Sequence, residues 1–302
     1  MRKALSALVV AAACLAAPAL AQERVTLGVG RSFNNDYLGD GHDRWRTGSY
    51  AVSVVRGTGW EGQLPDRLFE VIEYRLGTEI IAPSSLRSPP AWDRRYAGTL
   101  SFMAQTYMAR GAVELRAGAG LVGVGPSTGI GALQRDLHEW LSAPRPRVLD
   151  DQLGDAVYPV LTGEAGRPIA LGGAELRPFV EARLGDEDLL RFGADLAFGG
   201  RETGALWLRD NITGQRYVGI SGSSMPGMSF TLGVDTARVW DSAWLPASDG
   251  IAAEEWRHRF RAGVAVRGRN LGMFYGVTWL SEEFVGQPSG QLLGSVRVRM
   301  NF

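Results

Sequence analysis

A histidine and a glutamine four residues apart are the first residues in this sequence whose types and spacing could do chemistry. His138 and Gln134 lie in the stretch 125–141, GPSTGIGALQRDLHEWL. Side chains four apart share one face of a helix, and this face borders an apolar stripe. An imidazole at such a border is both held and solvated, and it can take a proton from water. The alternative is a histidine that only borders a buried face.

The same stretch predicts one short amphipathic helix near 128–142. Ser127 or Thr128 is the expected N-cap, and Pro144 prevents the helix from continuing. Five apolar residues recur at helical spacing, and we expect them to form the buried face: Ile130, Leu133, Leu137, Trp140 and Leu141. The helix would then hold His138 at the edge of a cleft.

A second polar group predicts a metal site made of oxygens. It comprises Asn34, Asn35, Asp36, Asp40, Asp43 and Thr47. The three histidines, His42, His138 and His258, have no paired spacing, and the only cysteine is Cys14, so a zinc site is not expected. Carboxylate and amide oxygens suit a hard cation such as calcium, although an ordinary Asn/Asp-rich loop has the same composition. Near Asp36, calcium would stabilise the oxyanion of ester hydrolysis while a histidine activates water. No G-x-S-x-G motif marks a serine nucleophile.

Apolar and charged residues alternate with period two along most of the chain, which predicts strands. Arg257, Arg259 and Arg261, for example, alternate with Phe260 and Ala262. The expected strands are 24–33, 47–57, 68–82, 97–109, 111–124, 156–165, 174–185, 188–199, 228–241, 254–267, 270–283 and 289–302. A soluble sandwich and a membrane barrel both alternate in this way, so the pattern alone does not separate them.

The two ends of the chain favour the barrel. Residues 1–21 have the charged, apolar and small-residue regions of a secretory signal peptide, and residues 22–302 would form the barrel. The alternation of the last strand runs to Phe302, an ending that resembles the assembly signal read by the barrel assembly machinery of the outer membrane. Basic and acidic residues are equal at 32 each, which gives no electrostatic support for nucleic acid as a partner. We therefore expect an all-β, transmembrane antiparallel barrel of about twelve strands in a bacterial outer membrane.

In an antiparallel barrel, every second connection lies at the same rim, and counting the strands (strand parity) places the polar clusters together at one rim. With both termini in the periplasm, the loops 34–46, 83–96, 125–155, 242–253 and 284–288 face the outside. This parity places the short helix, with His138, beside Asn35 and Asp36 at the extracellular rim. Mixed charges on the inward faces favour a cross-linked, filled lumen over an open pore. The long connection 200–227 falls on the periplasmic side, and alternation does not explain its length.

These motifs, in this order, resemble the lipid A 3-O-deacylase family of outer-membrane enzymes. The resemblance covers nearly the whole mature chain and rests on Asn35-Asp36, Asp43 to Gly48, Asp93 to Gly98, Gly125-Pro126-Ser127, Gln134, His138 and Asp151-Gln152. It implies a twelve-stranded barrel that uses calcium and a histidine to hydrolyse the 3′-linked acyl ester of lipid A in the lipopolysaccharide of the outer leaflet.

Carried over by motif, His138 would be the general base and Asp36 a calcium ligand. Asn35, Thr47 and Gln134 would be further active-site residues, and Arg87 and Arg94 would contact the substrate. The sequence departs from the family pattern at Arg46 and Arg95, and Arg87 is the nearest match to a family lysine. Two other readings stay open at this point: an outer-membrane phospholipase, and a structural or transport barrel without activity.

Overall fold

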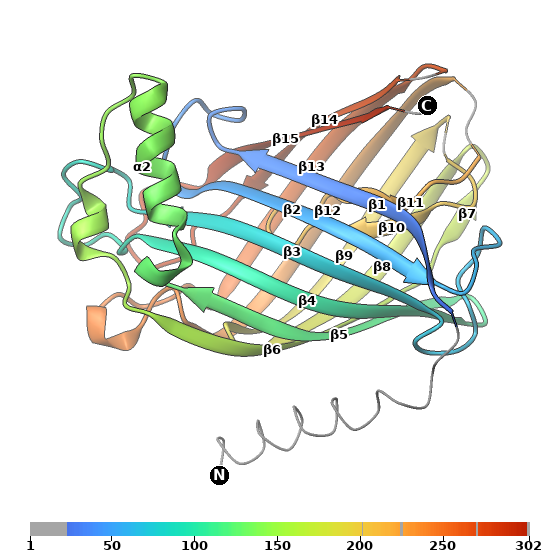
Figure 1. Cartoon of the computed structure of the whole chain (residues 1–302), viewed down its shortest axis with the longest axis horizontal. Helices are drawn as coiled ribbons and strands as arrows, with labels where there is room; N and C mark the ends of the chain where they lie inside the picture. Colours follow the sequence, from blue (N-terminus) through green and yellow to red (C-terminus); the bar gives the residue numbers. More distant parts are fainter. Residues whose placement is uncertain (1–22, 201, 224–225, 270, 301–302) are drawn as a thin grey trace, which may run out of the picture.

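A computed structural model describes residues 23–200, 202–223, 226–269 and 271–300, so the expected signal peptide and Phe302 lie outside the described residues. Twelve long antiparallel strands make the barrel wall (Figure 1). They are β1 (Val25–Asn35), β2 (Trp45–Gly57), β3 (Val71–Ala82), β4 (Ala97–Arg110), β5 (Val113–Val124), β6 (Ala156–Gly166), β8 (Ala174–Leu184), β9 (Glu187–Gly199), β12 (Gly227–Ser242), β13 (Trp256–Arg267), β14 (Leu271–Leu280) and β15 (Gln291–Met300).

The wall is closed at two places that are distant in sequence. β1 pairs with β15, and β6 pairs with β8, so each long strand pairs with two other long strands. A short strand, β7 (Ile169–Leu171), pairs only with β8. These pairings confirm the predicted twelve-stranded barrel. Closure is favourable because it satisfies the backbone groups that an open sheet would leave unpaired at its edges. No helix in the described part of the chain is long and apolar enough to cross a membrane.

Charged side chains fill the inside of the wall and pair with one another, as the sequence predicted. Asp235 accepts from Arg191 at 2.6 Å and from Arg259 at 2.9 Å, and it also pairs with Arg261. Glu164 accepts from Arg177 at 2.7 Å. The outward face carries exposed apolar side chains such as Leu76, Leu100, Phe102, Leu232 and Phe260.

Residues 206–220, within the unexplained connection 200–227, form a hairpin inside the lumen. Its strands are β10 (Leu206–Arg209) and β11 (Arg216–Ile220), which pair only with each other (Figure 1). Leu208 and Tyr217 pack with Val55 and Val71 of the wall in one buried cluster. The hairpin therefore fills part of the lumen, which gives the long periplasmic connection a structural role.

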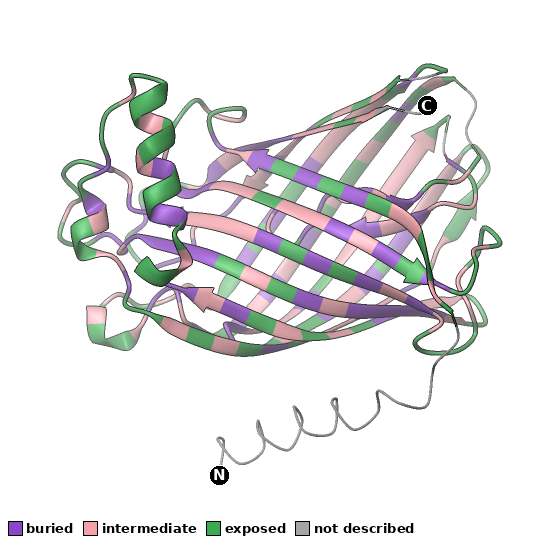
Figure 2. Cartoon of the chain, viewed as in Figure 1, coloured by how far each residue is buried: buried purple, intermediate pink, exposed green. Residues whose placement is uncertain are grey.

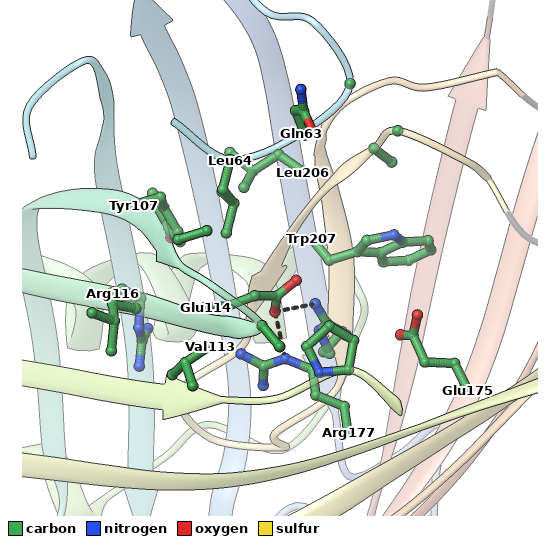
Figure 3. A pocket seen from close by; sticks show the side chains of 18 of the residues that line it. Gln63, Leu64, Tyr107, Val113, Glu114, Arg116, Glu175, Arg177, Leu206 and Trp207 are labelled. Carbon is green, nitrogen blue, oxygen red and sulfur yellow. Dashed lines mark hydrogen bonds and ion pairs between the residues drawn. The ribbon is translucent and has the colours of Figure 1, made fainter. Parts of the chain in front are cut away.

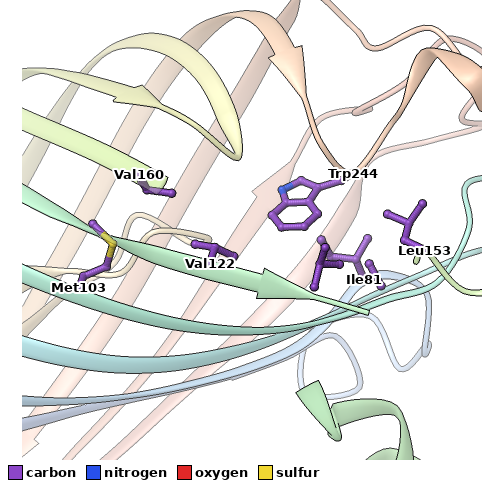
Figure 4. Packing of buried hydrophobic residues seen from close by; sticks show 8 residues of the cluster. Ile81, Met103, Val122, Leu153, Val160 and Trp244 are labelled. Atoms are coloured by element: carbon purple, nitrogen blue, oxygen red, sulfur yellow. The ribbon is translucent and has the colours of Figure 1, made fainter. Parts of the chain in front are cut away.

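A second apolar cluster closes the lumen below the extracellular loops. Trp244, from the connection that follows β12, packs on Ile81, Val122 and Leu153 (Figure 4). Helix α2 (Ile130–Trp140) stands outside this cluster at the same end of the barrel, after the 3-10 turn η2 (Pro126–Thr128) (Figure 1). A further 3-10 turn, η3 (Val148–Asp151), leads from α2 towards β6, and η4 (Ala247–Asp249) lies between β12 and β13.

Candidate active site at the outer rim

The strand register places part of the site on the membrane-facing side of the wall. Asn35 pairs with Gly48, Gly48 with Ile80, and Ile80 with Gly98. Gly98 is two residues before the exposed Leu100, and alternate residues of a strand share a face, so this row points outward. A Cβ at Gly98 would lie 2.9 Å from Cβ of Ile130, so the glycine lets α2 pack against the outside of β4.

A β-bulge places the Thr47 hydroxyl beside two carboxylates. The register of β2 against β3 shifts between Arg46 and Gly48, which leaves Thr47 as the extra residue. Its Oγ1 lies 3.0 Å from Asp36 Oδ1 and also contacts Asp43 Oδ1. Its carbonyl accepts from Asp36 N and from the Asn35 side chain, each at 3.0 Å. The bulge therefore joins the end of β1 to the first outer loop.

Asp36 is fully buried and has no cationic partner among the described residues. Its carboxylate accepts from Arg44 N at 2.7 Å and from the Thr47 hydroxyl. Burial raises the pKa of Asp36 to about 8, and the charges of Asp43 and Asp40 add to the rise against these two hydrogen bonds. Without a cation, this carboxyl is therefore largely protonated at neutral pH.

His138 contacts one of these carboxylates, that of Asp43. Its Nδ1 lies 2.8 Å from the carbonyl oxygen of Pro144, and a carbonyl only accepts, so Nδ1 carries the proton of the neutral ring. Its Nε2 lies 3.3 Å from Asp43 Oδ2. The structure therefore joins His138, Asp43, Thr47 and Asp36 through side-chain contacts. Asp43 belongs to the oxygen-rich loop of the sequence, but nothing in the sequence alone pairs it with His138.

Helix α2 differs from the expectation in two respects. Its N-cap is Gly129, with a left-handed φ of 73° and no side-chain cap, whereas Ser127 instead bonds to Asp155. Only Ile130 of the five apolar residues is buried, and the other four are exposed: Leu133 (63%), Leu137 (48%), Trp140 (79%) and Leu141 (57%). The prediction that the stripe packs in a protein core was wrong, because the helix lies at the surface of a membrane barrel (Figure 2).

Two polar side chains near this face have buried atoms without a hydrogen-bond partner among the described residues. They are Gln134, whose Oε1 is buried, and Tyr96, whose hydroxyl is buried. Burial and the charge of Asp43 raise the pKa of Tyr96, so its hydroxyl keeps its proton and stays a donor. The spacing to His138 predicted Gln134, whereas Tyr96 was expected only as part of the motif from Asp93 to Gly98. Each atom could make one further hydrogen bond if a water molecule or a substrate group entered beside it.

The two arginines predicted to contact the substrate lie in different environments. Arg87 is exposed in the second outer loop. Arg94 is buried and forms an ion pair with Glu283, which also accepts from Arg46 at 2.7 Å. Their assignment to substrate binding stays a prediction.

The oxygens of this site fit a hard cation. A hydroxyl has one hydrogen, so Thr47 can donate to only one of the two carboxylates that contact it. The other contact is repulsive unless a proton or a cation lies there. No group of three or more His, Cys, Asp and Glu side chains converges in the described chain, so hydroxyl, amide or main-chain oxygens would have to complete the ligand set.

A barrel of twelve strands with a rim helix that carries His138 invites comparison with known proteins. The family model described as "Outer membrane protein LpxR" matches residues 8–302. The chain belongs to the LpxR family. LpxR is a family of outer-membrane proteins, so the barrel lies in a bacterial outer membrane.

Two solved structures are among those similar to this chain. LpxR from Salmonella typhimurium has a TM-score of 0.74 and 17% sequence identity, over 91% of this chain and 100% of that chain. The β domain of the Bordetella autotransporter BrkA has a TM-score of 0.46 and 10% identity, over 91% and 99% of the two chains. No curated protein matches the sequence significantly. The likeness to the Salmonella protein shows that the two chains share one fold.

Proposed function

We propose that this protein is a calcium-dependent lipid A 3-O-deacylase that hydrolyses the 3′-linked acyl ester of lipid A in the outer leaflet. Membership of the LpxR family supports a lipid A-modifying protein of the outer membrane. The observation that carries the reaction is the contact of His138 Nε2 with Asp43, which shares the Thr47 hydroxyl with the buried Asp36.

His138 is the general base of this proposal. The proton on Nδ1 is held by the Pro144 carbonyl, so Nε2 is the nitrogen that can accept a proton from water. The imidazolium formed in this step lies against the Asp43 carboxylate, 3.3 Å from Nε2, which stabilises its charge. The same proton can then leave with the alcohol when the acyl ester breaks.

Asp36, Asp43 and Thr47 would hold the calcium ion, with Asn35 fixing the Thr47 carbonyl beside them. When bound, calcium polarises the ester carbonyl and stabilises the oxyanion. The burial of Asp36 suits this role, because a desolvated carboxylate without an arginine partner binds a cation in place of a proton. Gln134 and Tyr96 each offer a buried polar atom that can orient the water or the ester.

The substrate class follows from the side of the wall on which the site lies. Asn35 belongs to the outward row of the strands. Helix α2, with its exposed leucines, lies on the same outer face of the wall as the exposed Leu100 and Phe102. A lipid in the outer leaflet can therefore reach His138 laterally, with its acyl chains against apolar side chains and its polar part at the rim.

The direct test is mass spectrometry of lipid A from cells that express the protein or its His138→Asn variant. We expect the loss of one ester-linked acyl group with the wild type and full acylation with the variant. Fatty acid release from phospholipid with unchanged lipid A would replace this proposal by a phospholipase. No change in either lipid, with a folded barrel in the outer membrane, would support a structural or transport barrel.

A further inference from the structure

The luminal hairpin reaches the wall directly behind the site. Its tip, residues 210–215, approaches Asn34, the residue before Asn35. Asn34 Nδ2 donates to Asp210 Oδ2 at 3.0 Å and to Ser49 Oγ at 2.9 Å, and Ser295 Oγ donates to Asn34 Oδ1 at 2.6 Å. Asn34 is 1% exposed and Asp210 is 4% exposed, so water does not compete with these bonds.

The tip itself is a rigid turn built on the other oxygen of the same carboxylate. Asp210 Oδ1 accepts from Thr213 N and Thr213 Oγ1, each at 2.8 Å, and from Ile212 N at 3.1 Å. Arg259 donates to the carbonyls of Asn211 and Ile212 at 2.9 Å, and Gln215 donates to the Ala262 carbonyl at 3.1 Å. One carboxylate therefore holds the turn with Oδ1 and the wall with Oδ2.

Glycines in β1 let the hairpin lie against this strand. A Cβ at Gly28 would lie 2.2 Å from Gly219 O, and a Cβ at Gly30 would lie 2.8 Å from Val218 O. On its other side the hairpin borders a cavity of about 460 Å³ at the periplasmic end, lined by Trp207 and by wall residues such as Glu114 and Arg177 (Figure 3). The hairpin is therefore packed tightly on the strand that carries the site.

Consecutive strand residues point to opposite faces, which connects the lumen to the site. Asn34 points into the barrel and is held by the hairpin, whereas Asn35 points outward and donates to the Thr47 carbonyl. Asp36 follows at once and donates its own N–H to the same carbonyl. A shift of the chain at Asn34 would therefore move both Asn35 and Asp36.

We propose that Asp210 and Asn34 are positioning residues, through which the luminal hairpin fixes the end of β1 and with it Asn35 and Asp36. This inference rests on the proposed function for its effect on catalysis. The hairpin supplies no group to the reaction. It holds the wall from behind, so that the calcium-binding carboxylate keeps its place against Thr47 and His138.

Asp210→Asn tests the link selectively. The side-chain oxygen of the asparagine can still accept from the turn, whereas its NH₂ group would face the NH₂ group of Asn34, and two donors repel. The reciprocal exchange Asp210→Asn with Asn34→Asp restores one donor and one acceptor. Tyr217→Phe is the matched control, because it removes a hairpin-to-wall hydrogen bond, to Ser53 at 3.0 Å, away from the site.

We expect Asp210→Asn to lower kcat on lipid A by at least about tenfold, with KM within about twofold, since small misplacements of reacting groups can cost as much as about a hundredfold. The double variant should recover most of the loss, and Tyr217→Phe should stay within about twofold of the wild type. A folded Asp210→Asn protein with wild-type kcat would overturn the proposal. So would a double variant no better than the single ones.

Hydrogen exchange gives a readout that does not depend on activity. Peptides that cover residues 34–47 should exchange faster in Asp210→Asn and return towards the wild-type rate in the double variant. If hydrogen exchange in this segment is the same in Asp210→Asn and the wild type, the positioning role is overturned. This result counts even if the enzyme assay detects no activity. Inactivity of the wild type on lipid A would contradict the proposed function alone. If Asp210→Asn lacks the heat-modifiable gel mobility of a closed barrel, Asn34→Ser breaks the same bond from the wall side.

Discussion

Two buried aspartates of this barrel have opposite surroundings. Asp235, in the lumen, is 2% exposed and pairs with three arginines, two of them at 2.6 and 2.9 Å. Asp36, at the rim, is 0% exposed and accepts only from a backbone N–H and a hydroxyl, with Asp43 and Asp40 nearby. The lumen uses its charges to cross-link strands. The rim leaves a buried carboxyl without a cationic partner, so its ionised form is costly until a cation binds.

This difference indicates that the charged side chains of the lumen stabilise the barrel, whereas the carboxylates of the rim serve its function. The arginines of the lumen come from inward positions of the wall strands and from the hairpin, and their acidic partners, such as Glu164 and Asp195, lie on the wall. The rim carboxylates come from one loop after β1 and are held together by the bulge at Thr47. Removing a charge should therefore affect activity at the rim and stability in the lumen.

The largest effect is expected from His138→Asn, which removes the base and keeps a side chain of similar polarity. Turnover should fall by about 10² to 10⁴-fold, the usual contribution of a general base. Steady-state deacylation of purified lipid A measures it. Because His138 lies at the rim, the variant should keep its heat-modifiable mobility. A folded variant with normal turnover would remove His138 from the mechanism.

Asp36→Asn should come next, because it preserves shape and removes the charge. The calcium concentration for half-maximal activity should rise by at least about tenfold, since affinity follows the number of charged ligands. Asp40→Asn is the control: Asp40 lies in the same loop but already pairs with Arg44 at 3.2 Å. Equal calcium requirements for the wild type and Asp36→Asn would show that this carboxylate does not bind the ion.

The raised pKa of Asp36 predicts a pH-dependent calcium requirement. Below about pH 8 the metal-free carboxyl carries a proton that calcium must displace, whereas above this pH it is already ionised. The half-activating calcium concentration should therefore rise as the pH falls below 8, by up to about tenfold per pH unit, and level off above it. Calcium titrations of activity between pH 6 and about 9 measure this dependence. A requirement that does not change with pH would contradict proton–calcium competition at Asp36.

The smallest effect on activity is expected from Asp235→Asn. Its three arginines would lose a buried partner, which typically costs about 3–5 kcal/mol, so urea unfolding in micelles should shift to lower concentration. Turnover of the folded fraction should stay within about twofold of the wild type. A large fall in turnover without a loss of stability would mean that the lumen and the rim are not separate in function.

The wall could be predicted because alternation is a local signal that long strands repeat over ten or more residues. The luminal hairpin could not, since its strands are short and its partners, Gly28 and Gly30, are far away in sequence. The apolar face of α2 was assigned to a protein core because periodicity does not distinguish protein from lipid as the apolar partner. Asp36 and Thr47 were found by residue type and motif, whereas the contact of Asp43 with His138 depends on how two loops fold together.

Reloading the metal-free protein tests whether the rim carboxylates of Asp36 and Asp43 bind calcium for ester hydrolysis. Purified protein is treated with EDTA, mixed with lipid A in micelles, and assayed by mass spectrometry without metal, with calcium and with zinc. We expect the loss of one ester-linked acyl chain with calcium, little loss with zinc and none without metal. Full deacylation by the wild-type protein in EDTA would contradict the role of calcium. Full deacylation by the metal-free His138→Asn protein would contradict it as well.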